Sequence, residues 1–532
     1  MITSEEQQLR EHLALDEVTF AIPAQSFAIA CAISAEETLP VVTEFALRIA
    51  YVCGDLSPLQ IQEFFGFSKK ETDAVVAALL AERLIQWNED RLELTSYALA
   101  RFQDSSDNLP RFFKIQDWSA EVVFDLISFH PAGRPDRVKR VRFQVELAMR
   151  NLEKQSRTIQ YAEQAFQQHF RNICKKHKAE IYKISAVDAG ERFSIPLPCK
   201  FHLDLEGQTS VRRDIGDENF GSRLEIAESI SDALAHRGEG NNDRLRDFIR
   251  TFDDEVIGRY AMNDAFDLRR YVQDVHLTRI TGYNDERVTP ILGALYLERN
   301  ADLVLRRIKT GLEEAARLAS LAMSEEEATE LARSGEERGN PTPDRPAAPI
   351  QHDGLWWAPE TSLWARSRSA RDFAHTLERL LGGGVRAPDA LPCLRVVLPG
   401  DRRSARERLS VYWDHFPRMV GADVSLMQGM LELLIVPKVL VCVLFRFHLA
   451  HQPIGIPMGF ISSREDHLRV ATSLLSGKVL AKPGALTPTL EDEQGDSTRD
   501  VEGLIRRMGN RSTSVQARPN GQSKLTLRRT LG

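Results

Sequence analysis

The residues whose types and spacing could do chemistry gather at one predicted helix start, Ser68-Lys-Lys-Glu71. A serine followed three residues later by a glutamate is a capping box, so a helix is expected to begin here. We expect Lys69, Lys70, Thr72 and Asp73 to be exposed on its first turn. Lysine ammonium groups neutralise phosphates, whereas Thr and Asp side chains can reach base edges. The chemistry indicated is contact with a nucleic acid.

The elements that would position this helix are predicted across residues 41–99. Apolar residues at helical spacing predict three successive helices. The second begins at Ser57-Pro58, because serine caps helices and proline suits a first helical position, and it ends at Gly66. Alternating apolar and polar residues then predict a two-stranded hairpin over 85–87 and 91–95, with an acidic turn between the strands.

This order of elements resembles the winged-helix superfamily. The resemblance implies that the helix beginning near Lys69 enters the major groove of duplex DNA, while the hairpin, with Arg91, touches the backbone. A winged helix used for protein contact or packing is the alternative, because Glu71, Asp73 and the acidic hairpin turn place negative charge beside the lysines. A continuous apolar patch over this helix would favour the alternative.

A second group of cations follows the turn at residues 130–136 and opens a long predicted helix. Positive charge is disfavoured at a helix N-terminus by the macrodipole, so we expect these cations to contact phosphates instead. A solvated face is the alternative. The residues concerned are Arg134, Arg137, Lys139, Arg140 and Arg142.

His202, Asp204 and Glu206 alternate with apolar residues, so a strand would place them on one face. Such a face could hold a metal or an acid–base site, but any strand with one wet face shows the same alternation. The sequence contains no Walker A, G-x-S-x-G or H-E-x-x-H pattern. We therefore predict no catalytic residue, metal or cofactor, and expect a protein that is not an enzyme.

A chain of 532 residues is too long for one ordinary core, and its composition predicts a multidomain α+β protein. We expect a helix around residues 120–129, the long helix from about 136, strands within 179–240 and helices within 241–322. The expected parts are a winged-helix domain with its lead-in at 1–105, a central domain of helices and strands at 106–323, a flexible linker rich in Glu, Gly and Pro at 324–350, a C-terminal α/β domain at 351–482, and a disordered basic tail at 483–532.

The C-terminal α/β domain resembles, in architecture only, one half of a phospholipase-D-like fold. That family carries His-x-Lys followed four residues later by Asp, whereas this chain has His448 and His451 with no lysine at the required offset. The resemblance therefore implies a module without the family's histidine nucleophile. A nuclease or phosphodiesterase site in this domain is the enzymatic alternative. His415 is expected to be an ordinary packed or surface histidine.

The net charge of −7 excludes a uniformly basic nucleic-acid coat, so any such contact must be local. Six cysteines without a C-x-x-C pair argue against a zinc ribbon and a disulfide framework. The polar N-terminus and the lack of a clean apolar run of about 20 residues indicate neither a signal peptide nor a membrane span. We expect a cytoplasmic, non-catalytic protein that binds duplex DNA and other protein subunits, as part of a bacterial DNA-processing or anti-phage defence assembly.

Overall fold

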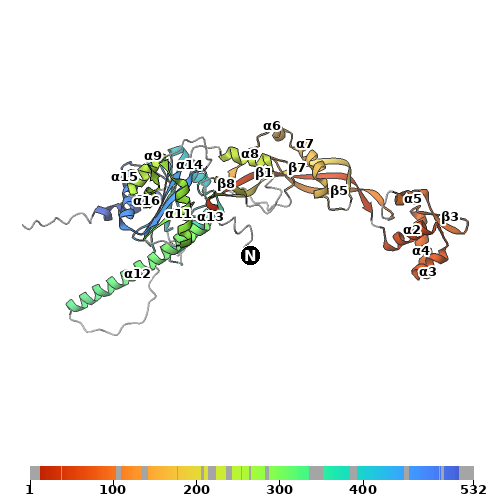
Figure 1. Cartoon of the computed structure of the whole chain (residues 1–532), viewed down its shortest axis with the longest axis horizontal. Coiled ribbons are helices and arrows are strands. Elements are labelled where there is room, and N and C mark those ends of the chain that lie inside the picture. The colour runs from red at the N-terminus through yellow and green to blue at the C-terminus, as the bar shows by residue number, and fades with distance from the viewer. Residues whose placement is uncertain are drawn as a thin grey trace, which may run out of the picture. The chain divides into compact units, whose positions relative to one another are not determined.

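The structure is a computed structural model with helices and strands throughout (Figure 1). The chain forms two compact units. Unit 1 comprises Met1–Ile22, Val138–Ala148 and Pro196–Gly532, and unit 2 comprises Pro23–Arg137 and Met149–Ile195. No helix among the described residues is long and apolar enough to cross a membrane. The structure describes residues 12–37, 39–103, 109–132, 142–176, 178–204, 209–213, 223–234, 242–252, 255–262, 265–281, 287–334, 351–383, 392–448, 454–489, 492 and 496–513.

The sequence assigns no secondary structure to the residues before the winged-helix candidate. In the structure they contain the long strand β1 (His12–Glu37). In unit 2 it pairs antiparallel with β5 (Phe112–Asp125) and lies next to β7 (Glu180–Asp204). Alternate residues of β1 are buried, because successive side chains of a strand point to opposite faces. They pack against α7 (Thr158–Ile173), which follows the short helix α6 (Leu152–Ser156).

Two sequence predictions in this region are wrong. Residues 120–125 belong to β5, because Val122 and Phe124 pack on the sheet face that contacts α7, which suits β-branched and aromatic side chains. The long helix expected from residue 136 is absent over 142–151, where β6 (Val145–Glu146) lies instead. The helical region begins with α6, after Asn151, whose side chain accepts hydrogen bonds from the first backbone amides.

A small module over residues 41–103 of unit 2 follows the predicted element order, with one additional strand that joins the hairpin in a three-stranded sheet of order β2-β4-β3. The predicted Ser57 and Ser68 caps are confirmed, and Gly66 ends its helix in the left-handed conformation at φ 68°. The elements are α2 (Val41–Cys53), β2 (Asp55–Leu56), α3 (Pro58–Phe65), α4 (Lys69–Ala81), β3 (Ile85–Asn88), β4 (Arg91–Leu94) and α5 (Ser96–Gln103). We call this the 41–103 module.

Unit 1 is built on an eight-stranded sheet in which β12, β13 and β14 are parallel and the remaining pairs are antiparallel. Helices α12 and α13 pack on one face, and α9 packs on the other through Phe248 and Phe252. In spatial order the strands are β11 (Val288–Leu292), β17 (Ile456–Ser462), β16 (Leu440–Phe447), β15 (Leu431–Val436), β12 (Gly354–Trp357), β13 (Leu394–Pro399), β14 (Met419–Ala422) and β18 (Leu486–Thr487).

Residues 351–482 contain both helices and strands, as the α/β character predicted for this segment requires. The remaining elements of unit 1 are β8 (Thr209–Arg213), α8 (Leu224–Leu234), α9 (Asn242–Phe252), α10 (Glu255–Gly258), β9 (Ala261–Met262), β10 (Ala265–Phe266), α11 (Leu268–Thr281), α12 (Glu298–Ser334), α13 (Arg368–Leu381), α14 (Arg402–Val411), α15 (Glu465–Val479) and α16 (Asp496–Thr513).

The predicted separation of a central domain at 106–323 from an α/β domain at 351–482 differs from the structure. Strand β11, from the first segment, pairs along its whole length with β17, from the second. Helix α12 extends from residue 298 into the expected linker, whose residues 335–350 lie outside the described ones. The two segments therefore share one sheet, a long-range pairing that local composition does not reveal.

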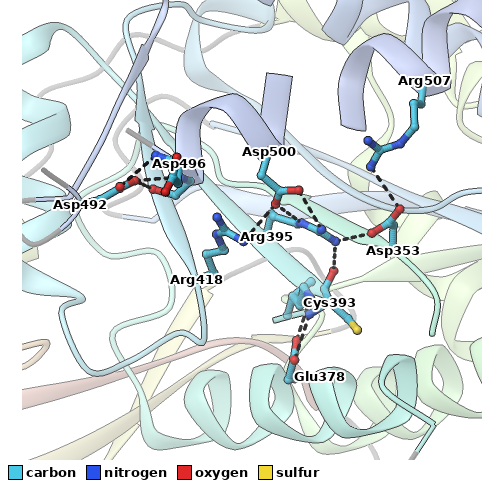
Figure 2. A network of polar contacts seen from close by, with 11 residues as sticks. Asp353, Glu378, Cys393, Arg395, Arg418, Asp492, Asp496, Asp500 and Arg507 are labelled. Carbon is cyan, nitrogen blue, oxygen red and sulfur yellow. Dashed lines mark hydrogen bonds and ion pairs between the residues drawn. The ribbon is translucent and has the colours of Figure 1, made fainter. Parts of the chain in front are cut away.

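The expectation of a disordered tail from residue 483 is wrong for α16, whose Val501, Leu504 and Ile505 are buried. Figure 2 shows how its Asp500 meets the amino-terminal ends of the parallel strands. Asp500 accepts a hydrogen bond from Arg395 at 2.8 Å and pairs with Arg418 at 3.2 Å. These ion pairs and the apolar face together hold α16 on the sheet; residues 514–532 lie outside the described part.

Candidate nucleic-acid interface

The first turn of α4 is fixed by the capping box at Ser68 and Glu71. The backbone amide of Ser68 donates to the Glu71 carboxylate at 2.8 Å, and the amide of Glu71 donates to the Ser68 hydroxyl oxygen at 3.4 Å. The backbone and hydroxyl donors of Ser68 lower the pKa of Glu71. Glu71 is therefore an ionised cap that satisfies the helix start.

Lys69, Lys70 and Asp73 are exposed on this turn, as expected. Thr72 is not, because only 2% of its surface is accessible and its hydroxyl donates to the Ser68 carbonyl at 3.1 Å. The expectation that Thr72 could reach a base edge is thus wrong, since a hydroxyl bonded within its own helix start is turned away from any partner. The first turn presents two ammonium groups and two carboxylates, those of the cap Glu71 and of Asp73.

The hairpin of the 41–103 module is held by its own polar side chains. Arg91 pairs with Asp55 of β2 at 2.9 Å, with about half of each side chain exposed, and Gln86 donates to Glu93 at 2.6 Å. Exposed ion pairs contribute only about 0–1 kcal/mol, so Arg91 can exchange Asp55 for another anion at little cost. Arg91 is both a brace of the hairpin and an available cation.

Electrostatics confine any phosphate contact by this module to a small area. Residues 41–99 contain five Lys and Arg but nine Asp and Glu, a net charge of −4. Beyond its first turn, the exposed face of α4 carries alanines at 74, 77, 78 and 81. Lys69 and Lys70 are therefore the only cations on α4 itself, and an acidic surround opposes a duplex elsewhere on the module.

Large apolar side chains are also exposed on the 41–103 module. Leu59 and Phe64 of α3 are each 63% exposed, and Trp87 of the hairpin is 50% exposed. Isolated exposed apolar residues are ordinary, but several on one small module are typical of a protein contact surface. These side chains lie on α3 and on the hairpin, so they favour a protein contact by those elements and not the patch over α4 that the alternative predicts.

The second predicted group of cations is only partly described. Arg134, Arg137, Lys139 and Arg140 lie outside the described residues. Arg142 is exposed in a turn ahead of β6 and belongs to unit 1. Because Arg142 does not open a helix, the macrodipole argument does not apply to it. Arg142 thus lies in a different unit from Lys69 and Lys70.

The alternative enzymatic residues lie on separate elements of unit 1. His202 and Asp204 are half-buried on β7, while Glu206 and His451 lie outside the described residues. The Nδ1 atom of His448 lies 3.2 Å from the Arg446 carbonyl oxygen. Within the described ranges, His, Cys, Asp and Glu form no group of three or more that could hold a metal ion.

A buried polar cluster in unit 1 escaped the sequence reasoning. Arg446 donates to Asp16 of β1 at 2.9 Å and lies 3.7 Å from Glu432, while Tyr296 donates to Asp16. Trp356 donates to Glu432 at 3.0 Å. Burial raises the pKa of Glu432 and of Tyr296.

Arg446 keeps its charge within this cluster. Burial opposes the charge, but Asp16 and Glu432 together raise the pKa of Arg446 above its ordinary value. The side chains of Asp16, Glu432 and Arg446 are at most 3% exposed, and their ion pairs anchor β1 to β15 and β16 of the sheet. Its only signal in the sequence is the charge of Glu432 and Arg446 inside otherwise apolar strands.

Comparison of the chain with models of protein families, with curated proteins and with solved structures finds no match. The likeness of the 41–103 module to winged helices therefore rests on its element order, its caps and its hairpin. The architectural likeness of residues 351–482 to a phospholipase-D-like half stays a prediction that no comparison tests. Function has to be argued from the surfaces described above.

Proposed function

We propose that this chain is a non-catalytic protein that binds duplex DNA through the first turn of α4. The observation that carries the proposal is the pair of exposed lysines, Lys69 and Lys70, at the start of a helix preceded by a short helix and followed by a hairpin. In winged helices this position enters the major groove. Lys69, Lys70 and Arg91 would neutralise phosphates, and Asp73 would face base edges.

The strength of this contact is limited by the charge of the module. Each phosphate contact to duplex adds about 0.9 to the slope of log affinity against log salt, so the two lysines together supply about 1.8. Specific DNA-binding proteins commonly use several times as many contacts. We therefore propose that α4 is one contact among several, within a bacterial DNA-processing or anti-phage defence assembly that includes other protein subunits.

The salt dependence of duplex affinity tests the proposal. The wild type, Lys69→Glu/Lys70→Glu and the matched control Lys309→Glu/Lys478→Glu are titrated with duplex at several salt concentrations. Both pairs of lysines are exposed, so both variants change the charge equally without touching a core. We expect the α4 variant alone to bind more weakly, with a slope smaller by about 1.8. Equal binding by all three proteins would contradict the proposal.

A second candidate function, binding of a protein partner, is favoured by the exposed Leu59, Phe64 and Trp87. If the module binds a protein, a partner that co-purifies with the wild type should be lost from Leu59→Ser/Phe64→Ser. The same partner should still co-purify with Lys69→Glu/Lys70→Glu. Loss in the lysine variant and retention in the apolar variant would count against a protein-binding role for this surface.

A further inference from the structure

A hollow of about 730 Å³ lies on unit 2 where α7 ends and β7 begins. Its lining includes four cations, Arg171, Lys175, Lys176 and Lys178, and the ring of Phe113. A neighbouring hollow of about 540 Å³ shares Arg171 and Glu180 with it and adds Tyr182 and Lys183. The two hollows therefore lie next to each other. We call the combined lining of cations and rings the α7–β7 surface: Phe113, Arg171, Lys175, Lys176, Lys178, Tyr182 and Lys183.

The local fold forces these side chains outward. Phe170 and Cys174 are buried and anchor the end of α7 in the core of unit 2. Lys175 and Lys176 follow the helix directly and are exposed. Cations near a helix C-terminus are favoured by the macrodipole, an effect that fades within the last turn. Lys183 lies on β7, so helix stabilisation does not account for the whole group.

Much of this positive charge is available to a partner. Lys175 and Lys176 have no ion-pair partner within the part of the chain that the structure describes. Arg171 lies 3.9 Å from Glu180, but their side chains are 86% and 75% exposed, so the pair is weak. Lys178 lies 3.4 Å from Glu36. The lining of the two hollows holds five cations against two carboxylates, those of Glu163 and Glu180.

Aromatic rings beside the cations indicate which kind of negatively charged partner this surface fits. Phe113 is 45% exposed and Tyr182 is 66% exposed. A solvent-exposed ring next to phosphate-binding cations provides a platform on which an unpaired base stacks. Bases within a duplex are already stacked on one another. An acidic peptide carries no base that could stack on the exposed rings. The combination therefore fits a single strand better than either.

We infer that the α7–β7 surface binds single-stranded nucleic acid, with phosphates on Lys175, Lys176 and Arg171 and bases on Phe113 and Tyr182. This inference goes beyond the proposed duplex contact of α4, because it concerns other residues and another form of nucleic acid. It does not depend on whether α4 binds duplex.

The test measures fluorescence anisotropy of a labelled oligothymidylate of about 20 nucleotides with the full chain, at several salt concentrations. We expect Phe113→Ala/Tyr182→Ala to weaken binding by about 30-fold or more without changing the salt slope, because it removes two stacking rings and no charge. Lys175→Glu/Lys176→Glu should weaken binding and reduce the slope by about 1.4, which is two single-strand phosphate contacts.

Two controls keep the inference separate from general charge effects and from the α4 proposal. Lys309→Glu/Lys478→Glu, with the same charge change on unit 1, should bind the single strand as the wild type does. Lys69→Glu/Lys70→Glu should lose duplex affinity alone. Circular dichroism checks folding, and Tyr182→Ala alone provides a milder ring variant.

Three results would overturn the inference: no single-strand binding by the wild type, unchanged affinity in the ring variants, or an equal loss in the unit 1 control. None of these outcomes bears on whether α4 binds duplex.

Discussion

His415 should make the stability of unit 1 depend on pH. It is 2% exposed and its ring contacts Phe143, Tyr412 and Phe416 at centroid distances of 4.6–5.6 Å. Burial lowers the pKa of His415 from 6.5 to about 3. As pH falls below 6.5, the unfolded chain binds a proton that the folded chain does not, so stability is lost between about pH 6.5 and pH 3.

The size of the effect follows from the linkage relation. Each pH unit below the unfolded pKa costs about 1.4 kcal/mol, so the loss at about pH 5 is roughly 2 kcal/mol. Because the ring is buried, solvent screening does not reduce this value. Replacement by phenylalanine removes the titrating group and keeps a ring of similar size among the three aromatic neighbours.

Urea denaturation of the wild type and of His415→Phe at about pH 7 and about pH 5 measures the effect. Other groups titrate in both proteins, so the difference between the two pH dependences isolates His415. We expect the wild type to lose roughly 2 kcal/mol more than the variant on acidification. The same pH dependence in both proteins would refute the reasoning.

The polar contacts of unit 1 give three further predictions. Asp16→Asn should cost about 3–5 kcal/mol in urea denaturation, because it removes the charge that lies 2.9 Å from buried Arg446; a loss below about 1 kcal/mol would contradict an anchoring role. Burial raises the pKa of Glu432 above its ordinary 4.5, so the folded chain keeps a proton that the unfolded chain releases, and stability falls as pH rises above 4.5. Glu432→Gln should make this fall shallower in urea denaturation, and the same pH dependence in both proteins would contradict the prediction. Asp500→Asn should cost about 2 kcal/mol and speed amide exchange across α16, since it removes the charge that faces Arg395; unchanged protection of α16 would show that apolar packing alone holds it.

Local signals predicted the 41–103 module well. Ser57, Gly66 and Ser68 act through hydrogen bonds and backbone preferences within a few residues, so their effect can be read from neighbouring sequence. The exposed Lys69 and Lys70 follow from the same signals. Thr72 was misjudged because its hydroxyl bonds back to the Ser68 carbonyl, a choice that depends on the side-chain rotamer rather than on position.

Long-range partners account for what the sequence could not predict. Strand β1 is buried on both faces near its start, as at Val18 and Phe20 to Ile22, so the alternation that identifies a strand is missing there. Strand β11 gains its place only by pairing with β17, about 170 residues away. Helix α16 lies in a segment whose polar composition is typical of a loose tail, but Arg395 supplies the partner for its Asp500.

The candidate site at the end of α7 also combines neighbouring residues with a distant one. Lys175 and Lys176 stand next to each other in the sequence, yet only the fold places them beside Phe113, which lies on a strand some 60 residues earlier. The run of cations was visible in the sequence, whereas the ring that gives it a chemical preference was not. A site within one short segment can thus be predicted from the sequence. A surface built from segments that are distant in the sequence cannot.

Photo-crosslinking tests the duplex contact of α4 most directly. A benzoylphenylalanine placed at Asp73, on the first turn of α4, is compared with one at Glu313, which is exposed on α12 of unit 1. With labelled duplex, the account predicts a crosslink at position 73 and none at position 313. A protein that binds duplex but crosslinks at position 313 and not at position 73 would contradict it.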